Sequence, residues 1–166
     1  MSTIPEDYLP PKEFQPDRIY SLKEFASYPD PLNSTEELLD KQIAAGRGDS
    51  PALMSGDKVL TYKQLLGASC KIGNALRKLG VEEADRVLLR SPNVPPAIFT
   101  NFGVLRLGAV MVPTSHMLSP PEITHIANNA EAKVIVVAAA FLEGVVKARP
   151  NLKTVKHVIV FGGQPE

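Results

Sequence analysis

Short apolar runs alternate with longer amphipathic segments over most of the chain. Between residues 85 and 162, four short runs are largely apolar at consecutive positions, which is typical of strands buried on both faces. The segments between them have apolar residues spaced three and four apart, and this spacing predicts helices. The predicted strands are DRVLLRS (85–91), AVMVPTS (109–115), KVIVVA (133–138) and VKHVIVFG (155–162).

Capping residues predict where the first helices begin and end. Asn33 or Ser34 can cap a helix that ends at Gly46, where glycine suits a left-handed backbone. Thr61 can cap the next helix, which ends at Gly80. The sequence PALMSGDKVL between these two helices predicts two short strands joined by a Ser-Gly-Asp turn.

Three further helices are predicted between the apolar strands. One covers residues 93–107, with Ser91 or Asn93 as its candidate cap. The second starts at Ser119, which is followed by two prolines, as is common in a first helical turn. The third covers residues 139–148.

Strands that alternate with helices predict an α/β fold. Because the strands are apolar on both faces, we expect a doubly wound, mainly parallel sheet with helices on both faces, over residues 34–166. Residues 1–33 contain six prolines, which block regular helices and predict an extended, Pro-rich arm. A short helical turn is compatible with Ser21–Tyr28 inside this arm.

Composition and charge limit which partners and cellular locations the sequence predicts. The 18 basic and 18 acidic residues balance, and no basic cluster predicts a nucleic-acid partner. The longest apolar run, at 134–142, is too short to span a bilayer, so no membrane partner is predicted. The N-terminal sequence does not resemble a secretory signal, and a single cysteine, Cys70, cannot form an internal disulfide. We therefore expect a cytoplasmic protein.

The sequence GRGDSP at 46–51 contains the Arg-Gly-Asp triplet that adhesion receptors bind. Gly and Asp are also ordinary turn residues, and the triplet lies between a predicted helix and a predicted strand. The second interpretation fits a chain with neither a predicted secretory signal nor disulfide pairs.

Candidate chemistry is sparse. The sequence has neither of the two common Gly-rich phosphate-binding motifs and no nucleophile elbow, so no catalytic residue is predicted. The three histidines lack ligand spacing, so no metal site is predicted. His116 follows a predicted strand at the edge where α/β sheets bind ligands, although a surface-loop histidine explains it as well. Ser91 and Asn93 similarly indicate either an anion at a helix N-terminus or simple capping.

Three segments in order resemble the AMP-forming adenylating enzymes, the superfamily of acyl- and aryl-CoA synthetases. LTYKQL (60–65) resembles the first core motif, and DRVLLRSPNVPPAIFTNFGVLRLGAVMVP (85–113) resembles the strand–helix–strand around the second. SPPEITHIANNAEAKVIVV (119–137) resembles the helix and strand that follow. The opening, DYLPPKEFQPDRIY (7–20) and LNSTEELLDKQIAAGRGDSPAL (32–53), is similar to aryl-CoA ligases of the 2-aminobenzoate and benzoate type.

This resemblance implies a two-step reaction. A carboxylate attacks the α-phosphate of ATP, and the thiol of CoA then displaces AMP, so the full enzyme uses ATP, Mg²⁺, CoA and an aromatic or other small acid. The family's phosphate loop, ribose-binding acid and catalytic lysine have no match in these 166 residues. We expect residues 34–166 to be the first subdomain of the large N-terminal domain, inactive alone and without tight cofactor binding. A non-catalytic binding or assembly module of the same fold is the alternative, and a homodimer is compatible with either.

The resemblance assigns few site residues. It implies structural roles for Leu107–Ala109, a tight helix-to-strand passage, and for Pro113, which ends a strand. Some aroyl-CoA ligases have an arginine for the CoA 3′-phosphate at the position that Met117 occupies here. Lys147 and Arg149 lie where certain acetyl-CoA synthetases place basic residues near this phosphate. Cations that oppose the dipole of a helix C-terminus explain both residues as well.

Overall fold

The computed structural model describes residues 9–17, 19, 21–29 and 31–163, which divide into two compact units, Met1–Leu32 and Asn33–Glu166. The described part of the first unit contains two short 3₁₀ turns, η2 (Lys12–Phe14) and η3 (Lys23–Ser27). The turn η3 confirms the helical turn predicted near residues 21–28. The extended arm over 1–33 stays a prediction, and its residues 1–8, 18, 20 and 30 lie outside the described part.

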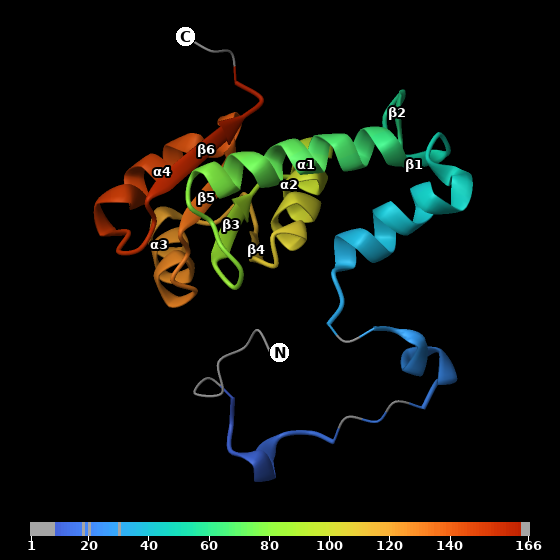
Figure 1. Ribbon diagram of the computed structural model, residues 1–166. Coiled ribbons are helices and arrows are strands. Elements are labelled where there is room, and N and C mark those ends of the chain that lie inside the picture. Colours follow the sequence, from blue (N-terminus) through green and yellow to red (C-terminus); the bar gives the residue numbers. More distant parts are fainter. Residues whose placement is uncertain (1–8, 18, 20, 30, 164–166) are drawn as a thin grey trace. The chain divides into compact units, whose positions relative to one another are not determined.

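The described strands of the second unit include one parallel sheet of four, in the order β4-β3-β5-β6 (Figure 1). These strands are β3 (Arg86–Arg90), β4 (Val110–Thr114), β5 (Val134–Ala138) and β6 (His157–Phe161). Every residue of β5 is buried, as expected for a central strand of a covered sheet. The parallel arrangement confirms the predicted sheet.

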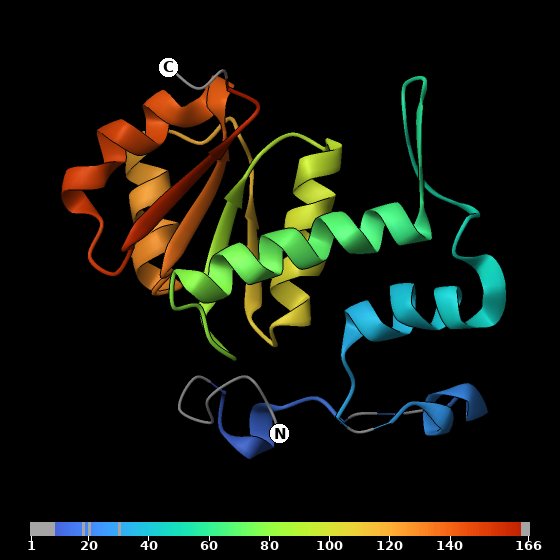
Figure 2. The ribbon, with the colours of Figure 1, turned by 45° about the horizontal axis from the view of Figure 1, so that its top comes forward.

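Helices cover both faces of this sheet, and Figure 2 shows the strands between them. The helices are α1 (Tyr62–Lys78), α2 (Pro95–Arg106), α3 (Pro120–Asn129) and α4 (Leu142–Ala148). Val87 and Leu89 pack with residues of α1 and α2, whereas Leu88 packs with residues of α3 and α4. The doubly wound α/β fold is therefore confirmed. Among the described residues, no helix combines the length and apolar composition that crossing a bilayer requires.

Glycines bring α1 and α2 into close contact. A β-carbon added to Gly103 of α2 would lie 2.8 Å from the carbonyl oxygen of Ser69 and 3.0 Å from the backbone nitrogen of Gly73, both in α1. Backbone atoms cannot rotate away as side chains do, so the packing of this helix pair requires glycine at 103.

Most of the predicted helix ends are confirmed. The Thr61 side chain accepts a hydrogen bond from the N–H of Gln64, whose side chain accepts one from the N–H of Thr61. Gly46 and Gly80 have φ values of 80° and 79°, the left-handed conformation expected at helix ends. Between them, β1 (Pro51–Ser55) and β2 (Lys58–Thr61) form the predicted antiparallel hairpin.

Two local predictions were wrong. Neither Ser91 nor Asn93 caps α2, because the helix begins later, at Pro95, with Val94 at its N-cap; the Ser91 hydroxyl instead donates to the carbonyl oxygen of Pro92. Pro113 does not end its strand, since β4 continues to Thr114. Proline is tolerated there because β4 is an edge strand in the described sheet.

The helix predicted after Asn33 is present but widened. It contains two π-helical segments, η4 (Glu36–Asp40) and η5 (Ile43–Arg47), joined by two residues that keep helical backbone angles. Gly46, near the end of η5, has a φ of 80°, so the regular helical backbone stops at this glycine. The Asn33 side-chain oxygen accepts hydrogen bonds from the N–H groups of Thr35 and Glu36, which confirms the predicted cap.

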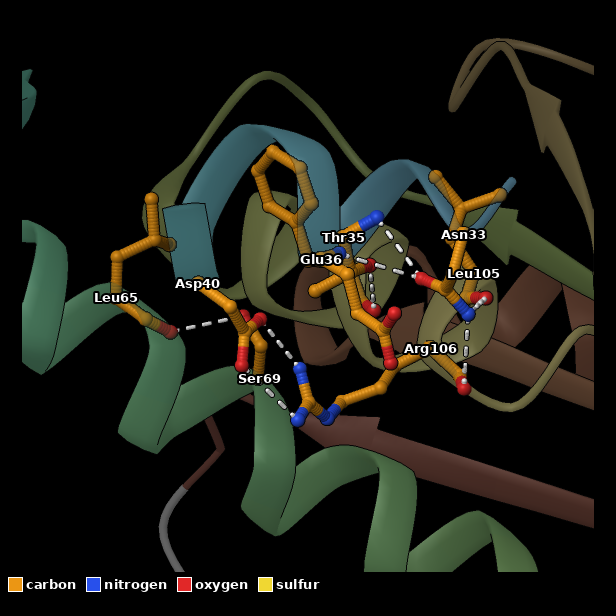
Figure 3. A network of polar contacts seen from close by, with 9 residues as sticks. Asn33, Thr35, Glu36, Asp40, Leu65, Ser69, Leu105 and Arg106 are labelled. Atoms are coloured by element: carbon orange, nitrogen blue, oxygen red, sulfur yellow. Dashed lines mark hydrogen bonds and ion pairs between the residues drawn. The ribbon is translucent and has the colours of Figure 1, made fainter. Parts of the chain in front are cut away.

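A polar network attaches this widened helix to the end of α2 (Figure 3). The side-chain amide of Asn33 donates to the carbonyl oxygens of Leu105 and Arg106, at 3.2 and 3.3 Å. The hydroxyl of Thr35, which is fully buried, donates to another carbonyl oxygen of α2 at 2.9 Å. Asp40 accepts two hydrogen bonds from the guanidinium of Arg106, and this interaction raises the pKa of that arginine.

Candidate functional site

The carboxyl ends of β3 and β5 form the place where this fold positions a ligand site. The two strands are neighbours, but the chain leaves β3 toward α2 on one face and β5 toward α4 on the other. Parallel α/β sheets bind ligands where the connections that leave two neighbouring strands go to opposite faces of the sheet. The candidate site therefore consists of the turn 91–94, the loop 115–118 after β4, and the turn 139–141 after β5.

Arg90, the last residue of β3, lies at the centre of this edge. It is only 4% exposed, although it is charged. The three residues before it in the strand are apolar. Its guanidinium donates to the carbonyl oxygens of Ser115, at 3.0 Å, and Leu118, at 2.9 Å. Burial lowers the pKa of this guanidinium.

His116 and Met117 project from the loop that Arg90 contacts. The imidazole of His116 packs against the ring of Phe141, with ring centroids 4.6 Å apart and planes tilted by 46°. This contact joins the loop after β4 to the turn after β5. Met117 is 82% exposed, so the loop presents an apolar side chain at the position where the resemblance to aroyl-CoA ligases implies an arginine.

The N-terminus of α2 is a poor anion site. Its first two residues, Pro95 and Pro96, have no N–H group, and the N–H of Ala97 already donates to the carbonyl oxygen of Val94 at 2.9 Å. With so few free donors, this helix end offers little of the binding geometry that anions use at helix N-termini.

In the described part of the chain, histidine, cysteine and acidic residues form no group of three or more that could hold a metal ion. Acidic side chains near the sheet pair with cations instead, as in the contact of Asp85 with Lys133 at 2.6 Å.

Lys147 lies in the last turn of α4, and Arg149 follows just after this helix. Lys147 borders a surface hollow of about 390 Å³ between α3 and α4, together with Pro120, Pro121, Thr124, Ala148 and Asn151. Its ammonium pairs with Glu143 at 2.6 Å, and the hydrogen bond from Lys147 lowers the pKa of that carboxyl. Arg149 is exposed. Among the described residues, the side chains of Lys147 and Arg149 make no hydrogen bond or ion pair with the loops at the strand ends.

The Arg-Gly-Asp triplet follows the left-handed Gly46 at the end of the widened helix. The Nε of Arg47 donates to the side chain of Gln42, and Asp49 pairs with the ammonium of Lys63 at 2.8 Å. The N–H of Lys63 also donates to the carbonyl oxygen of Gly48. These bonds place the triplet in the connection to the hairpin, as the turn interpretation predicts.

Sequence reasoning missed Arg90. Its only signal is the sequence RVLLR, in which a strand that is otherwise apolar ends in a cation next to a predicted loop. Charged residues at strand ends are common, so burial and the two carbonyl contacts became visible only in the folded chain.

Comparisons with known proteins agree with this fold. Residues 40–166 match the family described as AMP-binding enzyme. A 3-hydroxybenzoate–CoA/4-hydroxybenzoate–CoA ligase of Thauera aromatica is 29% identical over 133 residues, which cover 80% of this chain and 25% of that protein. An acetyl-coenzyme A synthetase of Bacillus subtilis (strain 168) is 32% identical over 141 residues, covering 81% and 24% of the two chains. The chain thus spans about a quarter of the length of these curated relatives.

Solved structures give the same result. The anthranilate CoA ligase AuaEII, in complex with anthranoyl-AMP, matches with a TM-score of 0.76 and 30% identity over 81% of this chain and 26% of its own. A benzoate CoA ligase from Burkholderia xenovorans LB400 matches with a TM-score of 0.70 over 81% and 26% of the two chains; at 23% identity it supports the fold alone. The resemblance to adenylating enzymes that the sequence motifs indicated is confirmed.

Proposed function

Because the chain belongs to the AMP-binding enzyme family, we propose that it forms the N-terminal part of an ATP-dependent, AMP-forming acid–CoA ligase. The match over residues 40–166 is the observation that carries this proposal. It includes the four strands of the described parallel sheet and the described helices α1 to α4 that cover it. The whole enzyme would join a carboxylic acid to CoA through an acyl-adenylate.

We further propose an aromatic acid as the substrate. Relatives with similar sequences include ligases for hydroxybenzoates, and the anthranilate CoA ligase shares the fold at 30% identity. The acetyl-coenzyme A synthetase at 32% identity makes acetate the main competing substrate. The opening sequence, similar to ligases of the 2-aminobenzoate and benzoate type, favours the aromatic class.

The residues of this chain do not fit ATP and Mg²⁺ by themselves. The sequence has no Gly-rich loop ending in Lys-Gly for the phosphates, and the described residues contain no acidic cluster for the ion. We therefore propose that this segment supplies the rigid sheet and the loops at its carboxyl edge, and that it does not catalyse adenylation alone.

We propose Lys147 and Arg149 as contacts for a CoA phosphate. Both are exposed cations, and Lys147 borders the hollow between α3 and α4, so a phosphate could approach without moving the backbone. In the whole enzyme, Lys147→Gln combined with Arg149→Gln should raise the KM for CoA about two- to fivefold per contact and leave the KM for ATP unchanged. Lys156→Gln, at another exposed lysine, is the control. An unchanged KM for CoA would reject the assignment.

The acid-dependent exchange of pyrophosphate into ATP tests the proposed function. The polypeptide encoded by the complete reading frame should catalyse exchange with benzoate, 2-aminobenzoate or a hydroxybenzoate, and more weakly with acetate. The 166-residue chain should give no exchange with any of these acids. Absence of exchange by the complete polypeptide would favour the alternative, a binding or assembly module of the same fold. A cytoplasmic location and a homodimer stay predictions.

A further inference from the structure

The buried position of Arg90 is energetically unfavourable for a charged side chain. This arginine is 96% buried, and in the described part of the chain no carboxylate pairs with it. Its Nε is buried without a hydrogen-bond partner. Burying an unpaired charge or polar group opposes folding, and apolar residues of similar volume are often at least as stabilising. Global stability therefore does not explain an arginine at this strand end.

The contacts of Arg90 give the alternative explanation. One guanidinium nitrogen bonds the carbonyl oxygen of Ser115 and the other that of Leu118, the first and last residues of the loop. The internal hydrogen bonds of the loop are long by comparison, 3.4 Å from the N–H of Leu118 to the carbonyl oxygen of Ser115 and 3.2 Å from the N–H of Met117 to the Ser115 hydroxyl. The planar, forked guanidinium is the group that can hold two carbonyls at once.

The surrounding helix leaves room for this side chain. A β-carbon added to Gly144 of α4 would lie 3.3 Å from Nη2 of Arg90. A glycine at 144 therefore lets α4 pack beside the guanidinium. The hydroxyl of Thr114 adds a second link between strands by donating to the carbonyl oxygen of Leu89 at 3.0 Å. Arg90 of β3 thus bonds the loop 115–118, and His116 of this loop contacts Phe141 in the turn after β5.

We propose that Arg90 is a positioning residue that fixes the loop 115–118 at the carboxyl edge of the sheet, and with it the places of His116 and Met117. The hold on the loop follows from the geometry of this chain. Its purpose, a preorganised edge for the ligands of a CoA ligase, rests on the proposed function. Fixing the loop before binding saves the conformational entropy that a mobile loop would lose.

Amide hydrogen exchange measured by NMR on the 166-residue chain tests the proposal. Arg90→Met removes both hydrogen bonds and places an apolar side chain in the buried position. Exchange at the amides of Met117 and Leu118 should become about 10- to 100-fold faster, roughly tenfold for each hydrogen bond lost. Exchange at Ile135 in the core strand should stay within about twofold, and the urea midpoint should not fall.

Arg86 provides a matched control, because it is the same residue type at the opposite end of β3. It donates to the carbonyl oxygen of Ala130 and to the carboxylate of Glu131, both at 2.6 Å. Arg86→Met should accelerate exchange near residues 130–132 and leave Met117 and Leu118 unchanged.

Two results would overturn the proposal. In one, Arg90→Met leaves exchange at Met117 and Leu118 as in the wild type. In the other, exchange rises equally at these amides and at Ile135, which would make Arg90 a residue of global stability only. Should Arg90→Met fail to fold, Arg90→Lys gives the same comparison, since a lysine can retain one of the two carbonyl contacts. None of these measurements uses ATP or CoA, so their failure would leave the ligase proposal intact, and a failed exchange assay would leave the positioning role intact.

Discussion

Replacing Gly103 with alanine should destabilise the second unit through the contact between α1 and α2. The new methyl group would meet the carbonyl oxygen of Ser69 at 2.8 Å, the nitrogen of Gly73 at 3.0 Å and the β-carbon of Ile72 at 3.1 Å. Overpacking of this kind costs about 1–3 kcal/mol. The higher helix propensity of alanine offsets up to about 1 kcal/mol of this loss. The net loss in the free energy of unfolding should be about 1–2 kcal/mol, since the helices must separate slightly.

Urea unfolding followed by far-UV circular dichroism measures this loss. A loss of this size should also lower the melting temperature by about 2–8 °C in a chain of this length. Gly67→Ala is the matched control, because Gly67 lies in α1, the other helix of this pair, and an added β-carbon there meets nothing within 4 Å. It should stabilise the chain by about 0.5–1 kcal/mol. A Gly103→Ala variant as stable as Gly67→Ala would refute the close-packing argument.

Two further predictions concern charges. Asp40→Asn removes the ion pair with Arg106, in which both side chains are about one-third exposed. The free energy of unfolding should fall by about 0.5–1 kcal/mol in low salt and by less in 1 M NaCl, where the charges are screened. A loss of stability that does not depend on salt would contradict an ionic origin. Burial alone would raise the pKa of Asp85, but hydrogen bonds from Lys133 and from the N–H of Glu82 lower it overall. Because the folded pKa lies below the unfolded value, this contribution is present above about pH 4 and is lost as the pH falls through the folded pKa. Stability of Asp85→Asn measured from pH 6 to pH 3 should therefore fall less steeply than that of the wild type, and parallel curves would contradict this.

Local chemistry made much of the fold predictable from sequence. Thr61, Gly80 and Ser119 are residues whose capping and left-handed preferences act within a few positions of the chain, and each has its predicted place. Apolar runs predicted buried strands for the same reason, since burial on both faces requires them.

The missed features depend on contacts that are distant in sequence. Asn93 has the chemistry of a helix cap, but two prolines after Val94 move the helix start beyond its reach. Arg90 contacts a loop 25 residues away because β3 and β4 are neighbours in the sheet. The residues next to Arg90 in the sequence give no information about this contact. The π-helical segments within residues 36–47 were also missed. They lie where the helix makes contacts distant in sequence, such as the hydrogen bond between Asp40 and Arg106.

The nucleotide products of the complete enzyme test the central claim most directly. Phosphorus NMR of a reaction with ATP, Mg²⁺, CoA and 2-aminobenzoate or a hydroxybenzoate would follow them together with the thioester. An AMP-forming ligase that contains this chain should release AMP and pyrophosphate in equal amounts, one of each for every aryl-CoA formed. Release of ADP and phosphate, or a thioester formed without AMP, would contradict the account.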